Sequence, residues 1–163
     1  MIFLTLGTCP IAFDRLVEAV DSLVADGSIK DEVFAQVGVC TYKPKHFKYA
    51  DMMAKNDFDS TFEKAEGVIG HAGVGTILMA LENDKPLLIM PRMKKYKEHV
   101  NDHQVATAQY FDKEGSALVA YTTEDLALKI AELATFVPKK RVIQAEAISR
   151  RIGEFLTGVS QAS

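Results

Sequence analysis

The chain has 163 residues, 48% of them hydrophobic and 25% charged, with a net charge of -3 at pH 7. This balance is typical of one soluble globular domain over 1–163, and its mild acidity argues against a nucleic-acid-binding protein, which needs a dominant basic surface. No apolar run approaches the roughly 18 residues that cross a bilayer. The first residues contain neither a basic stretch nor a small-residue cleavage site, so we expect no secretory signal. The two cysteines, Cys9 and Cys40, have no short spacing. We therefore expect free thiols and a cytoplasmic location.

Short apolar runs alternate with amphipathic segments along the chain. Runs of apolar and β-branched residues closed by turn residues predict strands at 2–6, 33–39, 68–69, 86–91 and 117–120, with a short strand or turn near 47–50. Apolar residues at helical spacing predict helices at 13–25, 58–65, 77–81, 98–112, 124–134 and 140–156. This alternation implies right-handed crossovers and therefore an α/β fold, a Rossmann-like, doubly wound and mainly parallel sheet. Two helix starts have candidate caps, Asp57 or Asp59 in one case and Thr122 or Thr123 in the other.

The strongest local signal is the segment His71-Ala72-Gly73-Val74-Gly75-Thr76, between a predicted strand and a predicted helix. Gly73 and Gly75 let a ligand approach the backbone, and the helix start around Val74 offers free N–H groups and a positive dipole end. Thr76 can add a hydroxyl donor, and His71 can give a phosphate oxygen a hydrogen bond or a positive charge. The segment matches neither the dinucleotide nor the P-loop glycine pattern. A strand-to-helix turn without a ligand is the alternative, and we favour a phosphate site.

Two further segments follow predicted strands, at the sheet edge where doubly wound proteins bind ligands. Gly7 and Thr8 end the first strand and should lie beside the loop around His71. Arg92 directly follows the strand at 86–91, where its positive charge could attract a phosphate. The other basic residues of that loop are more simply explained as a solvated surface.

The segment from Glu98 to Gln104 is the densest polar cluster of the sequence. His99 and His103 are four residues apart on one predicted helix face, a spacing that metal ligands use, but no third ligand is near and the H-E-x-x-H motif is absent. We therefore expect no metal there. Asp102 and Gln104, close to the helix start, can instead bond to the hydroxyls of a polar ligand, the alternative being a solvated helix start.

Several of these segments together resemble the C-terminal domain of family 28 glycosyltransferases. The resemblance is carried by His71–Thr76, by Lys85-Pro86-Leu87-Leu88-Ile89-Met90-Pro91-Arg92 and by Asp102-His103-Gln104, while 2–8 and 13–17 fit the start of the domain. It covers most of the chain up to about residue 120. It implies the C-terminal half of the two-domain GT-B fold. The sequence is similar in particular to the one-domain subunits of split transferases, which act on dolichol-linked oligosaccharide or in bacterial exopolysaccharide and capsule synthesis.

In such split enzymes the small chain binds the UDP-sugar, and a membrane-anchored partner supplies the site for a lipid-linked saccharide acceptor. The resemblance implies that His71 is the catalytic residue and faces the diphosphate, and that Asp102 and Gln104 contact the donor sugar. The family usually has a Glu that holds the ribose where this chain has Met79, so Glu82, one turn further on, is our candidate for that contact. The full set of expected UDP-sugar contacts is Gly7, Thr8, Gly73, Val74, Gly75, Thr76, Glu82, Arg92, His99, Asp102 and Gln104.

The implied reaction is inverting transfer of a hexose from a UDP-sugar, with no divalent metal and no cofactor besides that co-substrate. The general base would lie on the partner, so the chain alone should have little activity and would reach the membrane only through that partner. The terminal helix, with Ile148, Ile152, Phe155 and Leu156, can contact the partner or pack on the chain's own sheet, and an isolated chain could self-associate. Two alternatives stay open, a non-catalytic nucleotide-binding enhancer of a partner transferase and an unrelated doubly wound binder of a flavin or nicotinamide nucleotide.

Overall fold

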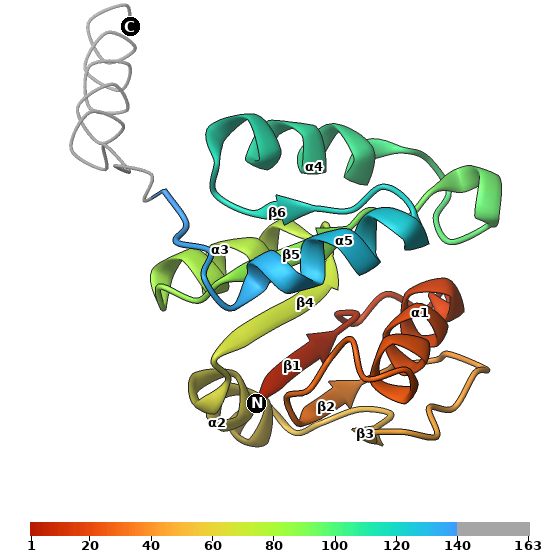
Figure 1. Ribbon diagram of the computed structural model, residues 1–163. Helices are drawn as coiled ribbons and strands as arrows, with labels where there is room; N and C mark the ends of the chain where they lie inside the picture. Colours follow the sequence, from red (N-terminus) through yellow and green to blue (C-terminus); the bar gives the residue numbers. More distant parts are fainter. Residues whose placement is uncertain (140–163) are drawn as a thin grey trace, which may run out of the picture.

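The structure is a computed structural model that describes residues 1–139 of the chain (Figure 1). Its strands are β1 (Ile2–Thr5), β2 (Val33–Gln36), β3 (Lys48–Ala50), β4 (Gly67–His71), β5 (Leu87–Met90) and β6 (Leu118–Val119). Its helices are α1 (Asp14–Ala25), α2 (Lys55–Lys64), α3 (Val74–Glu82), α4 (His103–Glu114) and α5 (Thr123–Leu133), with a 3₁₀ turn, η1 (Lys94–Tyr96). The helix expected at 140–156, with its apolar stripe, lies outside the described residues. Within residues 1–139, no helix has both the length and the apolarity that a bilayer crossing needs.

The six strands form one sheet in the order β3-β2-β1-β4-β5-β6, and every neighbouring pair is parallel. This confirms the predicted Rossmann-like, doubly wound sheet. The chain winds outward from β1 to β3, returns to the middle at β4 and then winds the other way, so the strand order reverses between β1 and β4. In open parallel sheets such a reversal leaves a crevice at the carboxyl ends of the two strands, where ligands bind.

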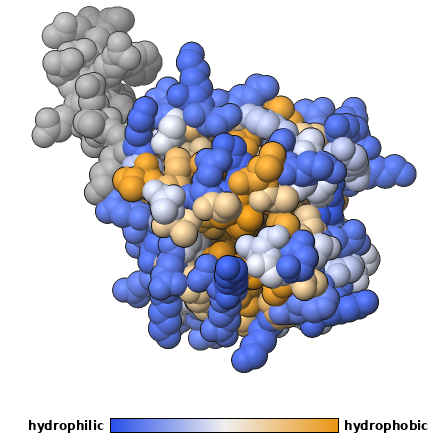
Figure 2. Space-filling view, in the orientation of Figure 1, coloured by the Kyte–Doolittle hydropathy of each residue, from blue (hydrophilic) through white to orange (hydrophobic). Residues whose placement is uncertain are grey.

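Helices cover both faces of the sheet, because alternate residues of each strand point to opposite sides. In β1, Leu4 belongs to the core beneath α1 and α5, whereas Phe3 belongs to the core beneath α2, α3 and α4. Both side chains are fully buried. On the face that carries α1 and α5, apolar residues gather around α5 within a hydrophilic border (Figure 2). The two buried cores fix the sheet between its helices and leave the strand-end loops free to form a site.

Two helix starts differ from those expected from the sequence. α2 begins at Lys55 without a side-chain cap, so the prediction that Asp57 or Asp59 caps this helix is wrong. α4 begins at His103 rather than near 98, because the chain forms η1 and then turns through Lys97, whose φ of 58° is left-handed. The loop between β5 and α4 is therefore longer than predicted, and it holds several of the expected ligand contacts.

Candidate functional site

The imidazole of His71 joins the loops that follow β1 and β4. His71 is the last residue of β4 and is 9% exposed. Its ring lies between Gly7 and Gly73, so that a Cβ on Gly7 would lie 2.7 Å from Cε1 and a Cβ on Gly73 would lie 2.1 Å from Nε2. Gly7 also has a left-handed φ of 68°. Because any larger residue at either position would displace the imidazole, these three residues form one unit at the strand reversal.

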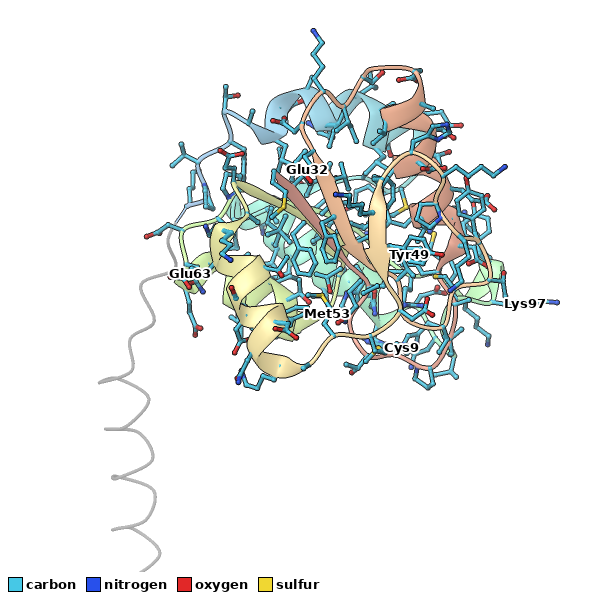
Figure 3. The ribbon with its side chains drawn as sticks, turned by 90° about the horizontal axis from the view of Figure 1, so that it is seen from below. Cys9, Glu32, Tyr49, Met53, Glu63 and Lys97 are labelled. Atoms are coloured by element: carbon cyan, nitrogen blue, oxygen red, sulfur yellow. The ribbon has the colours of Figure 1, made fainter. Side chains whose placement is uncertain are left out.

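The loops of this unit lie at one edge of the sheet. Figure 3 shows Cys9, in the loop after β1, and Met53, after β3, at the end toward which the strands run. Glu32, just before β2, lies at the opposite end. The loops after β1 and β4 meet at this edge through Gly7, Gly73 and His71, as the sequence predicted.

His71 is a neutral imidazole at neutral pH. Burial lowers its pKa to about 4, and the positive charge of Arg92 and the nearby His99 act in the same direction. Its buried Nδ1 has no hydrogen-bond partner among the described residues. The sequence left open whether His71 offers a ligand a hydrogen bond or a positive charge, and its burial favours the hydrogen bond.

The first turn of α3 presents N–H groups that no side chain of residues 1–139 caps. Gly73 occupies the cap position, the turn holds no acidic residue, and the Ile77 N–H bonds back to the Gly73 carbonyl at 3.1 Å. Val74 is 51% exposed, Thr76 is half-buried, and a Cβ on Gly75 would meet no atom within 4 Å. Among residues 1–139, no contact requires glycine at position 75, although glycine in a helix interior costs about 1 kcal/mol relative to alanine. An open, uncapped helix start is an arrangement that binds phosphate.

Arg92 lies inside the protein rather than facing a ligand. It is 1% exposed, and its Nη atoms donate to the carbonyls of Ile11 (2.7 Å), Ala12 (3.2 Å), Glu98 (3.3 Å) and Leu6 (3.2 Å). This placement contradicts the direct phosphate contact that we expected for Arg92, because its guanidinium donates to backbone carbonyls instead. The position of Arg92 directly after a strand correctly predicted the edge of the sheet at which it lies. It did not predict that the side chain points into the protein.

Two other predicted contacts also bond within the protein. Gln104 is 4% exposed, and its Oε1 accepts from the backbone N–H of Arg92 at 3.1 Å. Asp102 is exposed, and its Oδ1 accepts from the backbone N–H of Lys94 at 2.8 Å. Asp102 therefore stays accessible to a ligand hydroxyl, whereas the side-chain carbonyl of Gln104 is engaged inside the loop.

The two histidines of the polar cluster lie against each other. The rings of His99 and His103 meet edge to face, with 4.5 Å between their centroids. The Nδ1 of His99 is buried without a partner in the described part of the chain, and burial is the main cause that lowers the pKa of this residue. No three potential metal ligands come together within residues 1–139. His99 thus lies at the predicted edge with one ring nitrogen unused.

The last two predicted contacts lie at opposite ends of the sheet. Thr8 is exposed in the loop after β1, at the same edge as His71. Glu82 is the exposed final residue of α3, about 12 Å along the helix axis from Val74 at 1.5 Å per residue. The ribose contact expected for Glu82 is therefore not supported, because the residue lies at the far end of its helix. Met79 is half-buried and packs against the apolar core.

Sequence reasoning missed a partly buried ion pair beside the site. The Nε and Nη2 of Arg15 donate to the two carboxylate oxygens of Glu98 at 2.8 and 2.9 Å, and Glu98 is 5% exposed. Glu98 also accepts from the backbone N–H of Met93 at 3.0 Å. The two partners are 83 residues apart, so no local pattern links them. The only indication of this pair in the sequence was that the two residues have opposite charges.

Solved structures show the same class of fold. The glycosyltransferase SnogD from Streptomyces nogalater matches with a TM-score of 0.58 and 17% identity, over 82% of this chain and 34% of that one. The NMR solution structure of ALG13 matches with a TM-score of 0.57 and 18% identity, over 93% of both chains. The fold is that of the C-terminal domain of GT-B glycosyltransferases, as the sequence predicted.

Sequence comparison gives the family. Residues 1–154 match the glycosyltransferase family 28 C-terminal domain, and the chain belongs to that family. The UDP-N-acetylglucosamine transferase subunit ALG13 of Homo sapiens is 32% identical over 123 residues, which is 70% of this chain and 10% of that protein. The subunit of the same name from Cryptococcus neoformans is 34% identical over 91 residues, 55% of this chain and 43% of that protein. The chain thus spans less than half the length of these curated relatives.

Proposed function

We propose that the chain is the donor-binding catalytic subunit of an inverting glycosyltransferase that moves a hexose from a UDP-sugar. Family membership and the likeness to a protein named as a UDP-N-acetylglucosamine transferase subunit support this class of reaction. The observation that carries the proposal is the neutral His71 ring, held between Gly7 and Gly73 beside the uncapped start of α3. It lies at the strand reversal, where open parallel sheets bind nucleotides.

In this proposal the donor diphosphate lies against the first turn of α3. The acceptor hydroxyl attacks the anomeric carbon, the bond to the diphosphate breaks, and the departing UDP takes the electron pair. The N–H groups of Val74, Gly75 and Thr76 stabilise the negative charge that develops, and His71 donates a hydrogen bond to a phosphate oxygen. Preorganised donors of this kind typically contribute about 100–1,000-fold each to the rate. The scheme requires no divalent metal and no further cofactor.

A second, membrane-anchored subunit supplies the acceptor site and the general base that takes the acceptor proton. The human relative is named a subunit, and this chain covers 34% of the SnogD chain. Large aliphatic side chains are exposed after four strands, at Val39 (53%), Met52 (55%), Val74 (51%) and Val100 (70%). In this proposal these residues contribute to the contact with the partner. The acceptor is a lipid-linked saccharide of polysaccharide synthesis, and the partner holds this cytoplasmic chain at the membrane.

The donor site is tested by calorimetric titration of the full chain with UDP, NAD and FMN. UDP should bind, and NAD and FMN should not. His71→Ala should weaken UDP binding at least about ten-fold, the loss of one charge-assisted hydrogen bond. His46→Ala, which removes an imidazole from the exposed loop before β3, is the matched control and should leave the affinity unchanged. Preference for FMN or NAD would remove the transferase interpretation.

Reconstitution with the partner separates catalysis from enhancement. We expect the purified chain alone to transfer little sugar, and the complex with a membrane-anchored partner to transfer it from a UDP-sugar. His71→Ala in that complex should abolish transfer if this chain is catalytic. A partner that keeps its own activity and loses only the enhancement would instead identify a non-catalytic nucleotide-binding subunit. Robust transfer by the isolated chain would contradict the split site.

A further inference from the structure

One guanidinium bonds to both ends of the loop at 7–12. Arg92 donates from Nη2 to the carbonyl of Leu6 at 3.2 Å, just before this loop. From Nη1 it donates to the carbonyls of Ile11 at 2.7 Å and Ala12 at 3.2 Å, at the end of the loop. Arg92 itself follows β5, two strands away from β1 in the sheet. The side chain of a residue outside this loop therefore connects the two ends of the loop.

The bond to the Leu6 carbonyl also orients the next peptide group. A peptide is planar, so its carbonyl oxygen and the following N–H point in opposite directions. Holding the Leu6 oxygen therefore fixes the N–H of Gly7, which lies 3.4 Å from the Thr5 hydroxyl oxygen. Gly7 in turn lies so close to His71 that a Cβ would be 2.7 Å from the ring. The position of Gly7 against His71 thus depends on a hydrogen bond from Arg92.

Arg92 is itself held from several sides. Its guanidinium carbon lies 4.8 Å from the centre of the Phe13 ring, and its backbone N–H donates to Gln104. The Glu98 carbonyl accepts from Nη1 at 3.3 Å, and the Glu98 carboxylate forms the two-point ion pair with Arg15. The loop after β1, the start of α1 and the loop after β5 therefore meet at one guanidinium.

A buried cation is a costly way to gain stability. Removing a guanidinium from water costs free energy that its hydrogen bonds only offset, and apolar residues of similar volume are often as stable. The Nε of Arg92 has no partner among the described residues, which adds to that cost. What arginine supplies, and an apolar side chain does not, is a rigid fork of donors that reaches several carbonyls at once.

We propose that Arg92 is a positioning residue of the donor site, which holds the loop at 7–12 closed and Gly7 against His71 without touching the donor. The proposal rests on the proposed function for the identity of the ligand. Lysine cannot replace Arg92, because it has a single ammonium nitrogen. It lacks the planar fork of two Nη atoms that lets arginine bond to the Leu6 and Ile11 carbonyls at once. The loop is thus ordered before the donor arrives, which reduces the ordering cost of binding.

The test compares Arg92→Lys with a control that destabilises the protein elsewhere. Asp21→Asn is the control, because Asp21 is 1% exposed and accepts from Tyr42 and from the backbone N–H groups of Lys45 and His46, outside the loop at 7–12. Three quantities are measured on each full-length variant: the melting temperature, the UDP affinity and the hydrogen-exchange rates of the Gly7 and Thr8 amides.

Arg92→Lys should speed exchange at Gly7 and Thr8 about ten-fold or more and weaken UDP binding by a similar factor. Asp21→Asn should lower the melting temperature without either effect. If Arg92→Lys does not fold, Glu98→Gln should move the same amides in the same direction by less, since it loosens one support of Arg92.

Two results would overturn the positioning role. In the first, both variants change loop exchange and UDP affinity in proportion to their melting temperatures. In the second, Arg92→Lys leaves the Gly7 and Thr8 amides as protected as in the unmodified chain. A chain that does not bind UDP at all contradicts the donor site, and the exchange rates then decide the role of Arg92 by themselves.

Discussion

At the residue scale, two glycines near the start of α3 have different tasks. Gly73 has no room for a side chain beside His71, whereas a Cβ on Gly75 would meet no atom of the described residues within 4 Å. Gly75→Ala should therefore raise the free energy of unfolding by up to about 1 kcal/mol, because alanine is the better helix former. The same methyl group would stand where the diphosphate approaches, so the UDP affinity should fall. Thermal unfolding and calorimetric titration of this variant measure the two effects.

Gly73→Ala is the companion variant, with the opposite expectation for stability. Its Cβ would lie 2.1 Å from the Nε2 of His71, so the imidazole must move and the melting temperature should fall. An unchanged UDP affinity in Gly75→Ala would mean that phosphate does not bind at the start of α3.

The buried His71 also predicts how stability depends on pH. Its pKa is lowered from 6.5 to about 4 in the folded chain, so the unfolded chain binds a proton more readily. This contribution to stability is present above pH 6.5 and is lost as the pH falls toward 4. Between pH 7.5 and 5 it amounts to about 2 kcal/mol. Urea unfolding at both values should show this loss in the unmodified chain, and His71→Asn should remove most of it.

The carboxylates of α1 act in a different pH range. Burial alone would raise the pKa of Asp14 and of Asp21, but hydrogen bonds, chiefly from Thr41 and Tyr42 respectively, outweigh it and lower both below 3.8. Their stabilisation is present above that value and is lost only at lower pH. If His71→Asn loses as much stability between pH 7.5 and 5 as the unmodified chain, a group other than His71 causes the loss.

Residues whose contacts are close in sequence were predictable, and residues whose contacts are distant in sequence were not. The glycines around His71 were found because a strand, a glycine turn and a helix start follow one another in the sequence. The direction of Arg92 was not, because its acceptors Leu6, Ile11 and Ala12 precede it by 86, 81 and 80 residues. Sequence spacing alone contains no information about such a pairing.

At the scale of the element, the start of α5 is the best-specified helix end of the described chain. The Thr122 hydroxyl accepts from the Asp125 N–H at 3.1 Å, and the Asp125 carboxylate accepts from the Thr122 N–H at 3.1 Å. This reciprocal pair is a capping box. Thr122→Ala should lower the free energy of unfolding by about 1 kcal/mol in a denaturant titration. Thr123→Ala, one residue later and outside the cap, should cost less, and equal losses would refute the role of the cap.

The same scale shows why one helix boundary was predicted and another was not. The cap of α5 involves residues three apart, so the sequence contains it. α4 starts late because η1 and the left-handed Lys97 come first, and Glu98, which follows them in the loop, is paired with Arg15. Periodicity and capping rules cannot predict the conformation of a loop that bonds to a residue 83 positions away.

At the scale of the whole molecule, the order of the strands decides where the site can be. The sheet reverses between β1 and β4, and the loops after those two strands carry Gly7 and His71. The alternation of strands and helices was enough to predict this class of sheet, because parallel strands need helical crossovers. It was not enough to predict how the loops are joined, which depends on side chains such as Arg92 reaching across the edge.

A ligand at this edge should stabilise the whole fold, since binding to the native state alone shifts global unfolding. At about 100 times the dissociation constant the gain is about 2.7 kcal/mol, or roughly 5–10 °C in melting temperature for a domain of this size. UDP should give this shift, and UMP, which lacks the second phosphate, should give a smaller one. His71→Ala should narrow the difference between the two ligands, because the bond that distinguishes them is lost. A difference that persists unchanged in His71→Ala would mean that His71 does not contact the phosphate that UMP lacks.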